Sequence, residues 1–308
     1  MFDAKRLEIL LRVVEGGSVT AAADELFYTP SAVSQQLRKL EEEVGQPLLQ
    51  RRAKGMVATD AGLVLAGHAR SILRQMDAAS ADLDQIRGLK RGSLSIGTFP
   101  TLGGSFLPII ISRFRKENPG IRLDVRSDRL NGLVSLLASG EVGLCFMWEY
   151  DWHRLDPATF HITTVFEEPT VLLVGKEHPL ANASHRSPVT MASLASEEWI
   201  VRANEHPVAE VLERSCNVAG FSPNISFKAN DYQEAQAMVS VGLGIALAPQ
   251  SATVNLHPGV EVVPLEAAVP SRRVVLAQRH DRVHAPAEVA FQSLTLQLGA
   301  SWLSSIKS

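Results

Sequence analysis

Apolar residues in the first fifty positions recur with the period of helices. The segment 2–15 carries most of its large apolar side chains on one face, and two glycines follow it. A second segment, 20–27, is rich in alanine and lies after Ser18, whose hydroxyl can cap a helix. A third segment keeps four apolar residues at spacings of four, three and four, namely Val33, Leu37, Leu40 and Val44. The pattern therefore predicts three short helices in succession.

The third predicted helix, from Pro30 to Val44, has a distinctive polar face. Thr29 can cap this helix, and Pro30 occupies the first helical position, where its missing N–H costs nothing. Opposite the apolar stripe lie short polar groups and one guanidinium, namely Ser31, Ser34, Gln35 and Arg38. Such side chains can reach base edges and phosphates without holding a helix out of the major groove of DNA. We therefore expect a recognition helix.

A basic segment follows the third predicted helix. Gly45 and Pro47 end the helix, and the residues up to Ala58 fit a short hairpin, or wing. This segment contains no acidic residue and three basic ones, namely Arg51, Arg52 and Lys54. Because cationic contacts with phosphates supply much of the affinity for DNA, we expect these side chains to bind the DNA backbone.

Beyond Thr59 the spacing of apolar residues changes to an alternation of four and three. The residues that follow it are Leu65, Ala69, Ile72, Met76, Ala79, Leu83 and Ile86. This 3.5-residue repeat is typical of a coiled-coil seam, so we expect a dimerisation helix. Two recognition helices held by one seam would read two half-sites of an approximately palindromic operator. The alternative is a lone helix that packs on its own domain.

From Ser93 onward, predicted strands and helices alternate. Strands at 94–97, 121–126 and 142–148 are separated by helices at 102–116 and 130–138. This order is typical of a parallel sheet covered by helices. A second unit begins near Phe166 and has elements of the same two kinds: strands at 170–174, 198–201, 225–227, 242–249, 260–264 and 272–278, and helices at 208–220, 232–241 and 285–298. The sequence thus predicts an α/β domain of two units.

Composition narrows the function classes. The chain has 308 residues and a net charge of −3, which suits a folded protein of about two domains. It has no apolar signal segment and no run approaching the ~18 apolar residues of a membrane helix, so we expect a cytoplasmic protein without a membrane partner. Cys145 and Cys216 form no C-x-x-C pair and are expected to be small buried residues. The histidines are scattered and no hydrolase, zinc-protease or Walker motif occurs, so we expect no catalytic residue, cofactor or metal.

Residues in the first sixty or so positions resemble the winged helix-turn-helix of LysR-type transcriptional regulators. The matching residues are Ala21, Ala22, Ala23, Pro30, Ser31, Ala32, Val33, Ser34, Gln35, Leu40, Glu41, Gly45, Pro47, Leu48, Arg51, Thr59 and Gly62. Leu49 departs from the phenylalanine common in that family, which we expect to alter only the packing of the wing. The alternative is an ordinary helical corner whose polar face is merely solvated.

The order and spacing of the later elements are similar to the co-inducer domain of the same family, a two-lobed fold like type 2 periplasmic binding proteins. The resemblance implies a helix-rich winged helix-turn-helix domain at 1–58, a coiled-coil dimerisation helix at 59–87, a hinge at 88–92 and an α/β effector domain at 93–308. Within the effector domain, lobe I would comprise about 93–165 and 270–308, and lobe II about 166–269.

Candidate ligand-binding residues follow the strands of the two units. In open α/β sheets, ligands bind beyond the carboxyl ends of the strands, and in a two-lobed fold these ends face one cleft. The candidates in the first unit are Thr98, Phe99, Pro100, Thr101, Ser127, Phe146 and Trp148, and those in the second are Arg202, Asn204, Tyr232 and Gly244. We expect Thr98 or Thr101 to donate to a carboxylate and Arg202 to bind an acidic effector in bidentate fashion. The alternatives are that these threonines only cap a helix, that Phe146 or Trp148 fills the core, and that Arg202 is an exposed surface residue.

These expectations combine into one functional prediction. The chain would be a sequence-specific transcriptional regulator whose binding to promoter DNA is modulated by a small anionic metabolite in the interlobe cleft. Its partners would be double-stranded promoter DNA, the effector, RNA polymerase and other copies of itself, as a homodimer through 59–87 and as a homotetramer. Two alternatives are a ligand-independent repressor of the same fold, and a solute-binding or enzymatic protein whose helical N-terminus only dimerises it.

Overall fold

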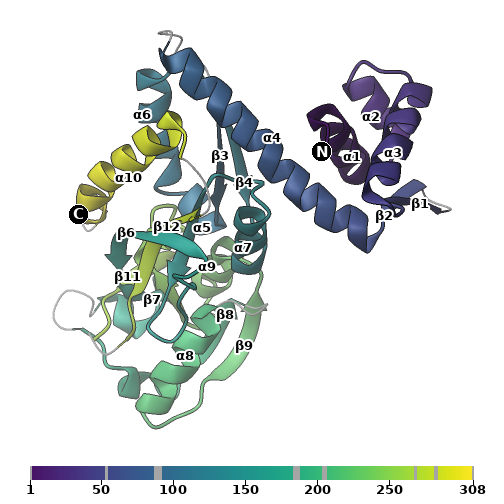
Figure 1. The fold of residues 1–308 in the computed structure, drawn as a ribbon. Coiled ribbons are helices and arrows are strands. Elements are labelled where there is room, and N and C mark those ends of the chain that lie inside the picture. The colour runs from purple at the N-terminus through teal and green to yellow at the C-terminus, as the bar shows by residue number, and fades with distance from the viewer. Residues whose placement is uncertain are drawn as a thin grey trace.

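The computed structural model describes residues 2–52, 55–86, 92–182, 188–202, 207–266, 269–280 and 284–306. A long helix joins a small N-terminal domain to a larger domain of mixed helices and strands (Figure 1). None of the helices in these ranges is both long and apolar enough to cross a membrane.

The N-terminal domain contains the three predicted helices and the wing. Its elements are α1 (Ala4–Gly16), α2 (Val19–Glu25), α3 (Pro30–Val44), β1 (Leu49–Arg52) and β2 (Gly55–Ala58). The three helices share one apolar core, because the stripe at Val33, Leu37 and Leu40 packs against the buried face of α1 and the alanines of α2. The prediction of three consecutive helices is confirmed.

Helix α4 (Asp60–Ile86) corrects part of the predicted seam. Ala69 is fully buried in the core of the N-terminal domain, and Leu65 packs against that core. These two positions therefore face the N-terminal core of the same chain, where α4 packs against α1. Further along, Ile72 and Met76 are 40% and 51% exposed. The side chains of the last two seam residues, Leu83 and Ile86, lie outside the described residues, as do positions 88–91 of the predicted hinge.

Helix α4 also contacts the effector domain. Its Arg70 forms ion pairs with Glu15 of α1 at 3.0 Å and with Glu141 of the effector domain at 3.3 Å. The neighbouring Ser71 accepts a hydrogen bond from Arg279 at 3.2 Å. One turn of α4 is thus attached to the domains on both sides of it.

Lobe I is built on a five-stranded sheet in the order β4-β3-β5-β12-β6. Its elements are β3 (Gly92–Thr98), α5 (Pro100–Gly103), α6 (Leu107–Glu117), β4 (Ile121–Ser127), α7 (Leu130–Ala138), β5 (Leu144–Glu149), β6 (Phe160–Glu168), β12 (Arg272–Arg279) and α10 (Pro286–Ser305). Strands β3, β4 and β5 are parallel as predicted, but β12 runs antiparallel to β5 and β6, so the sheet is mixed. The prediction of a single helix at 102–116 is wrong, because two helices occur there. Gly103 and Gly104 end α5, and α6 begins at Leu107.

Lobe II contains two smaller sheets. Its elements are β7 (Thr170–Gly175), β8 (Glu198–Arg202), α8 (Pro207–Val218), β9 (Asn224–Ala229), α9 (Tyr232–Ser240), β10 (Ala246–Pro249), β11 (Val260–Val263) and the short 3₁₀ helices η1 (Pro179–Asn182), η2 (Met191–Leu194) and η3 (Gln250–Thr253). Strands β8 and β9 are parallel, whereas β10 and β11 both pair with β7 antiparallel. The expected second parallel unit is therefore only partly present.

A buried ion pair lies where the chain passes between the lobes. Arg272, the first residue of β12, donates to Glu168 at the end of β6 through Nε at 2.9 Å and Nη2 at 2.6 Å. The other carboxylate oxygen of Glu168 accepts from the backbone N–H of Ser251 at 2.7 Å, and the Ser251 hydroxyl lies 3.0 Å from Arg272. Burial alone would lower the pKa of Arg272, but the adjacent Glu168 carboxylate raises it, so the guanidinium stays charged. This network joins three segments from both lobes.

Both cysteines are buried and unpaired, as expected. Burial raises the pKa of the Cys145 thiol, on β5, and raises that of Cys216, on α8, to about 11. Within the described ranges, no group of three or more histidine, cysteine or acidic side chains is placed to hold a metal ion.

Removing one partner of the buried pair should destabilise the effector domain strongly. Arg272→Met leaves the Glu168 carboxylate buried without its cation, which we expect to cost about 3–5 kcal/mol of unfolding free energy. The double variant Glu168→Gln with Arg272→Met should recover much of this loss. Urea unfolding measures both effects, and Arg214→Ala, which breaks the exposed pair of Arg214 with Glu210, is the matched control. Equal destabilisation by Arg272→Met and Arg214→Ala would contradict the assigned role.

Candidate DNA-reading surface and effector cavity

The recognition helix α3 begins with a side-chain cap. Thr29 Oγ1 accepts a hydrogen bond from the backbone N–H of Ala32 at 3.2 Å, and Pro30 follows as the first helical residue. Thr29 and Ser31 also share a hydrogen bond of 3.0 Å between their hydroxyls. The start of α3 is thus locally ordered, while Thr29, Pro30 and Ser31 remain exposed.

The predicted reading residues occupy one solvent-facing side of α3. Gln35 and Arg38 are exposed, and Ser34 is half-buried. The Ser34 hydroxyl donates to the carbonyl of Pro30 at 2.8 Å, which leaves its oxygen free to accept. Arg38 makes no ion pair with any carboxylate of the described residues, and only a long contact of 3.5 Å joins its Nε to the carbonyl of Ser34. Gln35 and Arg38 can therefore donate to bases or phosphates, while the Ser34 hydroxyl is available as an acceptor.

The wing is fastened to the recognition helix by one carboxylate. Glu41 of α3 accepts hydrogen bonds from the backbone N–H groups of Leu48 at 2.8 Å and Leu49 at 3.2 Å, at the start of β1. On the other side, the N–H of Met56 in β2 donates to the carbonyl of Gly17 at 2.9 Å. The wing therefore keeps a fixed position relative to α3. The sequence motif contained Glu41, but its position alone did not predict this role.

Two other motif residues are explained by the turn from the wing into α4. The Thr59 hydroxyl donates to the carbonyl of Pro47 at 2.8 Å and accepts from the N–H of Gly62 at 3.1 Å. A Cβ atom on Gly62 would lie 2.0 Å from the carbonyl oxygen of Leu48, so no larger residue fits there.

The structure describes the basic wing only in part. Arg51 is exposed and lies opposite Met56 in the β1–β2 ladder. Arg52 pairs with Gly55 through the backbone, while its side chain, like the whole of Lys54, lies outside the described residues. The three-residue phosphate contact therefore stays a prediction.

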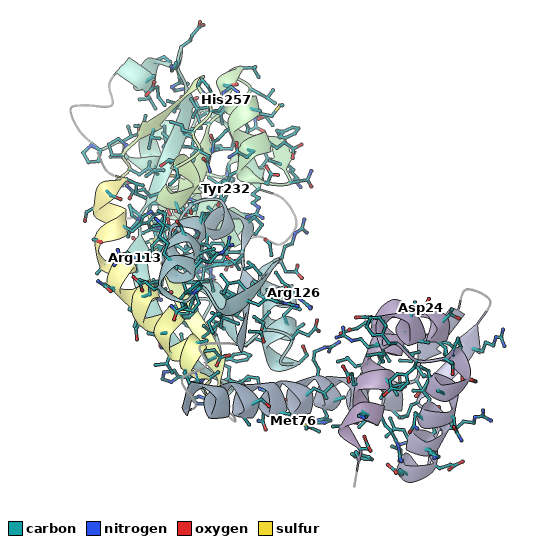
Figure 2. The ribbon with its side chains drawn as sticks, turned by 90° about the horizontal axis from the view of Figure 1, so that it is seen from above. Asp24, Met76, Arg113, Arg126, Tyr232 and His257 are labelled. Atoms are coloured by element: carbon teal, nitrogen blue, oxygen red, sulfur yellow. The ribbon has the colours of Figure 1, made fainter. Side chains whose placement is uncertain are left out.

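A cavity of about 140 Å³ lies between the two lobes. Lobe I contributes Pro100, Thr101 and Gly104, and lobe II contributes Arg202, Asp231, Tyr232, Gln233, Ser251, Ala252 and Asn255. Asn255 donates to the carbonyl of Gly104 at 2.7 Å, so the lobes are in contact at its rim. Figure 2 labels Tyr232, which belongs to this lining. The volume of the cavity suits a small molecule.

Arg202 is the main cationic group of the cavity. It ends β8, is 7% exposed, and donates through Nε to the carbonyl of Asn230 at 3.3 Å. Its guanidinium carbon lies 5.5 Å from the centre of the Tyr232 ring. Burial lowers the pKa of Arg202, whereas Tyr232 and the Asp231 carboxylate of the same lining act to raise it. No carboxylate of the described residues lies within ion-pair distance of Arg202, so its charge is only partly compensated. A buried cation without a carboxylate partner favours an anionic ligand.

Four of the predicted ligand residues line this cavity, namely Pro100, Thr101, Arg202 and Tyr232. Phe146 does not, because it is fully buried in the middle of β5, and the expectation for it is wrong. Phe99 and Trp148 also belong to the core, with their rings in edge-to-face contact at 4.8 Å. Phe99 lies beneath the guanidinium of Arg272, which is 5.0 Å from its ring centre.

The remaining predictions for the cleft have different outcomes. Thr98 is 2% exposed and its hydroxyl faces the carbonyl of Phe99 at 3.4 Å, so it is not available to a ligand. Ser127 is exposed beside Thr98 at the end of β4, outside the lining. The expectation that Gly244 lines the cleft is wrong. Gly244 precedes β10 and packs against the carbonyl of Glu198, at the opposite end of β8 from Arg202. Asn204 lies outside the described residues.

Sequence reasoning missed most of the polar lining from lobe II. Asp231 caps α9 through a 2.9 Å bond from the N–H of Glu234, and Gln233 follows on the first turn. Ser251 and Asn255 come after β10, whose carboxyl end points to the cavity. The rule for carboxyl ends of strands would have found Ser251, had it been applied to β10.

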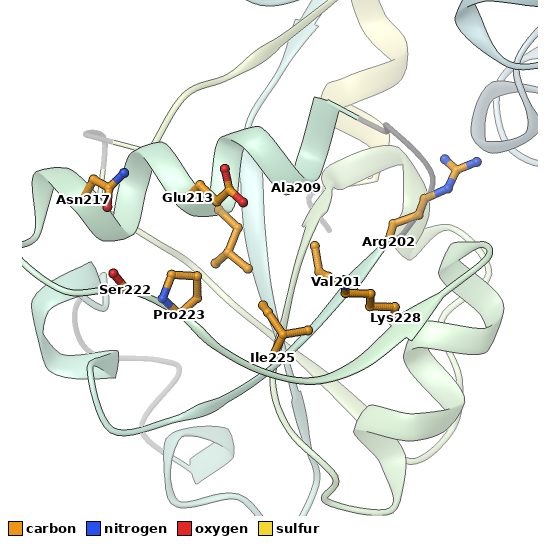
Figure 3. Close-up of a pocket in the computed structure, with 10 residues that line it drawn as sticks. Val201, Arg202, Ala209, Glu213, Asn217, Ser222, Pro223, Ile225 and Lys228 are labelled. Atoms are coloured by element: carbon orange, nitrogen blue, oxygen red, sulfur yellow. The ribbon is translucent and has the colours of Figure 1, made fainter.

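A second cavity of about 690 Å³ lies within lobe II, between α8 and strands β8 and β9. Figure 3 shows its lining, with Glu213, Asn217 and Ser222 at one end and Lys228 near Arg202. The guanidinium of Arg202 points away from Glu213, Asn217 and Ser222. Because one lobe alone lines this space, a ligand there would not bridge the two lobes. The interlobe cavity is the better effector site.

Comparison with known families matches both domains of the chain. Residues 4–63 match the family described as "Bacterial regulatory helix-turn-helix protein, lysR family". Residues 87–299 match the family described as "LysR substrate binding domain".

Individual relatives match over nearly the whole chain. The hydrogen peroxide-inducible genes activator of Dickeya chrysanthemi is 29% identical over 279 residues, which cover 90% of this chain and 89% of the relative. The transcriptional dual regulator GltC of Bacillus subtilis is 27% identical over 300 residues, covering 96% and 97%.

Solved structures share the fold. A cysteine-to-aspartate variant of full-length OxyR from Pseudomonas aeruginosa has a TM-score of 0.76 and 20% identity, covering 96% of this chain and 94% of that one. Full-length CbnR complexed with its target DNA has a TM-score of 0.69 and 20% identity, covering 96% and 99%.

Arg38→Ala separates base reading from phosphate binding. If Arg38 reads a base, the variant should lose about 1–3 kcal/mol of binding to an operator selected from random-sequence duplexes, with little change for unselected DNA. Gel-shift titrations of the full-length chain with both duplexes measure this. Equal losses on both duplexes would assign Arg38 to a phosphate, and no loss on either would refute the recognition surface.

Proposed function

Because this chain belongs to the LysR family of transcriptional regulators, we propose that a small anion held between its lobes controls how it binds promoter DNA. The chain is a DNA-binding regulator with an effector-binding domain, and its relatives are transcriptional regulators. The observation that carries the proposal is the buried Arg202, which has no carboxylate partner among the described residues and lines the interlobe cavity.

The cavity chemistry supports a carboxylate or a similarly small anion. Arg202 supplies a planar pair of donors, and Thr101 of lobe I lines the same cavity. Burial raises the pKa of Tyr232 to about 12, so its phenol stays protonated at neutral pH. A ligand that binds Arg202 and Thr101 together would connect lobe II with lobe I. A coupling of about 1–3 kcal/mol would then change promoter occupancy several-fold.

The proposal includes a dimer held by α4. Four apolar side chains on this helix are at least 40% exposed, namely Leu63, Val64, Ile72 and Met76. Ile72 and Met76 are one helical turn apart and share a side of α4, whereas Leu63 lies on the opposite side from Ile72. The pair of Ile72 and Met76 therefore favours a second copy as partner. A dimer would place two α3 helices on two half-sites, and two dimers would form the expected tetramer. We further propose that the protein acts in the cytoplasm and contacts RNA polymerase at its promoters.

The names of several relatives refer to hydrogen peroxide, but the thiols of this chain favour a different signal. Both cysteines are fully buried, and burial raises the pKa of each. Since the thiolate is the form that reacts with peroxide, a buried thiol of raised pKa reacts slowly. We therefore propose ligand binding, and not thiol oxidation, as the input.

Thiol reactivity gives one test. With a pKa of about 11 for Cys216, the thiolate fraction at pH 8 is roughly one thousandth, and it grows only as the pH rises toward that pKa. The folded protein should therefore resist iodoacetamide at pH 8, and hydrogen peroxide should leave its operator affinity unchanged. A peroxide response that Cys216→Ser or Cys145→Ser abolishes would overturn the proposal.

Ligand binding gives the second test. Small carboxylates and aromatic acids are screened by thermal shift on the full-length chain, and a hit present at 100 times its Kd should add about 2.7 kcal/mol of stability. Arg202→Met should remove the shift, while Lys228→Met, which alters only the larger cavity in lobe II, should not. The hit should also change operator affinity.

Other outcomes of the screen favour the alternatives. Loss of the shift in Lys228→Met would move the site to the larger cavity. Operator binding that is retained without any acid producing a shift would support a ligand-independent repressor.

A further inference from the structure

Phe27 has a backbone conformation that is unusual for its side chain. Its φ is +57°, and it is the one non-glycine residue with a positive φ in the described part of the chain. The N–H of Tyr28 donates to the carbonyl of Ala23 at 2.8 Å, and that of Phe27 contacts the carbonyl of Asp24 at 3.4 Å. These two bonds end α2 with a left-handed residue, a place where glycine is strongly preferred. A phenylalanine there is strained.

Packing does not compensate for this strain. The Phe27 side chain is 96% exposed, more than any other large apolar residue of the described chain. The strained position is nevertheless rigid, because Tyr28 and Phe27 are tied back to α2 by the two backbone bonds. Strained and exposed residues of this kind gather at functional sites.

The position of Phe27 identifies what the ring can meet. It lies two residues before Thr29, the cap of the recognition helix, so the two Cα atoms are at most roughly 7 Å apart. The neighbouring Thr29, Pro30 and Ser31 are exposed on the surface assigned to DNA reading. Asp24, three residues before Phe27, is exposed as well, so this part of the surface carries a negative charge that is unfavourable near phosphates. Sugar carbons offer an apolar surface without that charge.

We propose that Phe27 is a DNA contact, whose ring packs on a deoxyribose at the edge of the groove that α3 enters. The contact rests on the proposed DNA-reading surface and extends it by an apolar element. Because every nucleotide carries the same sugar, the ring adds affinity without selecting a sequence. Because it neutralises no phosphate, it adds nothing to the salt dependence of binding.

The test uses four variants of the full-length protein. Phe27→Gly and Phe27→Ala remove the ring, and each should weaken binding by roughly three- to ten-fold on selected operator and on random DNA alike. The slope of log affinity against log salt should stay unchanged, whereas Arg51→Ala should reduce it by about one. Phe27→Tyr keeps the ring and should keep the affinity.

Stability separates this role from a structural one. Phe27→Gly relieves the left-handed strain, so its melting temperature should equal or exceed that of the parent protein while its DNA affinity falls. Val218→Ala changes an apolar side chain that is 86% exposed in the effector domain and should alter neither quantity. A melting temperature that falls together with DNA affinity in Phe27→Gly would indicate a structural role and overturn the proposal.

Two further results would refute the contact. One is unchanged DNA affinity in both Phe27→Gly and Phe27→Ala. The other is a smaller oligomer in size-exclusion chromatography with light scattering, which would assign the ring to a second copy. Loss of operator binding in Arg38→Ala, combined with no effect at Phe27, would leave the reading surface valid and refute only this inference.

Discussion

The buried pair of Glu168 and Arg272 is the interaction on which the two-lobed architecture depends. The chain passes between the lobes twice, after β6 and before β12, and these two residues stand at those crossings. Ser251 joins the same network from lobe II and also lines the interlobe cavity. A buried ion pair is sensitive to the loss of either partner, so its geometry fixes how the lobes are hinged. The cavity lies directly beside this fixed point, where a ligand on one lobe is within reach of the other.

The N-terminal domain could be predicted largely from its sequence, because its signals are local. Thr29 and Pro30 mark the start of α3 within two residues, and the apolar stripe fixes which face is buried. The effector domain depends on contacts between distant residues. Glu168 and Arg272 are 104 positions apart, and no short pattern indicates that they pair. The antiparallel return of β12 likewise arises from chain topology, and periodicity does not report it.

The same difference explains the ligand residues. The rule for carboxyl ends of strands indicated Thr101 and Arg202, and the structure places both on the interlobe cavity, because that rule follows from the topology of parallel sheets. It failed for Phe146, which lies within β5 and not beyond its end, and for Gly244, which lies before β10 and not after it. The prediction that Leu65 and Ala69 of α4 contact a partner helix failed for another reason. A 3.5-residue repeat does not say whether the residues that cover it belong to the same chain, and here the core of the N-terminal domain packs against both positions.

The attachment of α4 to both domains gives it the mechanics of a rigid arm. The 27 residues of α4 span about 40 Å, and the wing precedes its first residue. Within the helix, Arg70 and Ser71 contact the effector domain. The contacts at Arg70 and Ser71 lie about ten residues, or about 15 Å, from the start of α4 at Asp60, so a tilt of about 5° about them moves that end of the helix by roughly 1.3 Å. Such a tilt also changes the Arg70 ion pairs with Glu15 and Glu141, so the orientation of a recognition helix is coupled to the contacts that α4 makes with both domains.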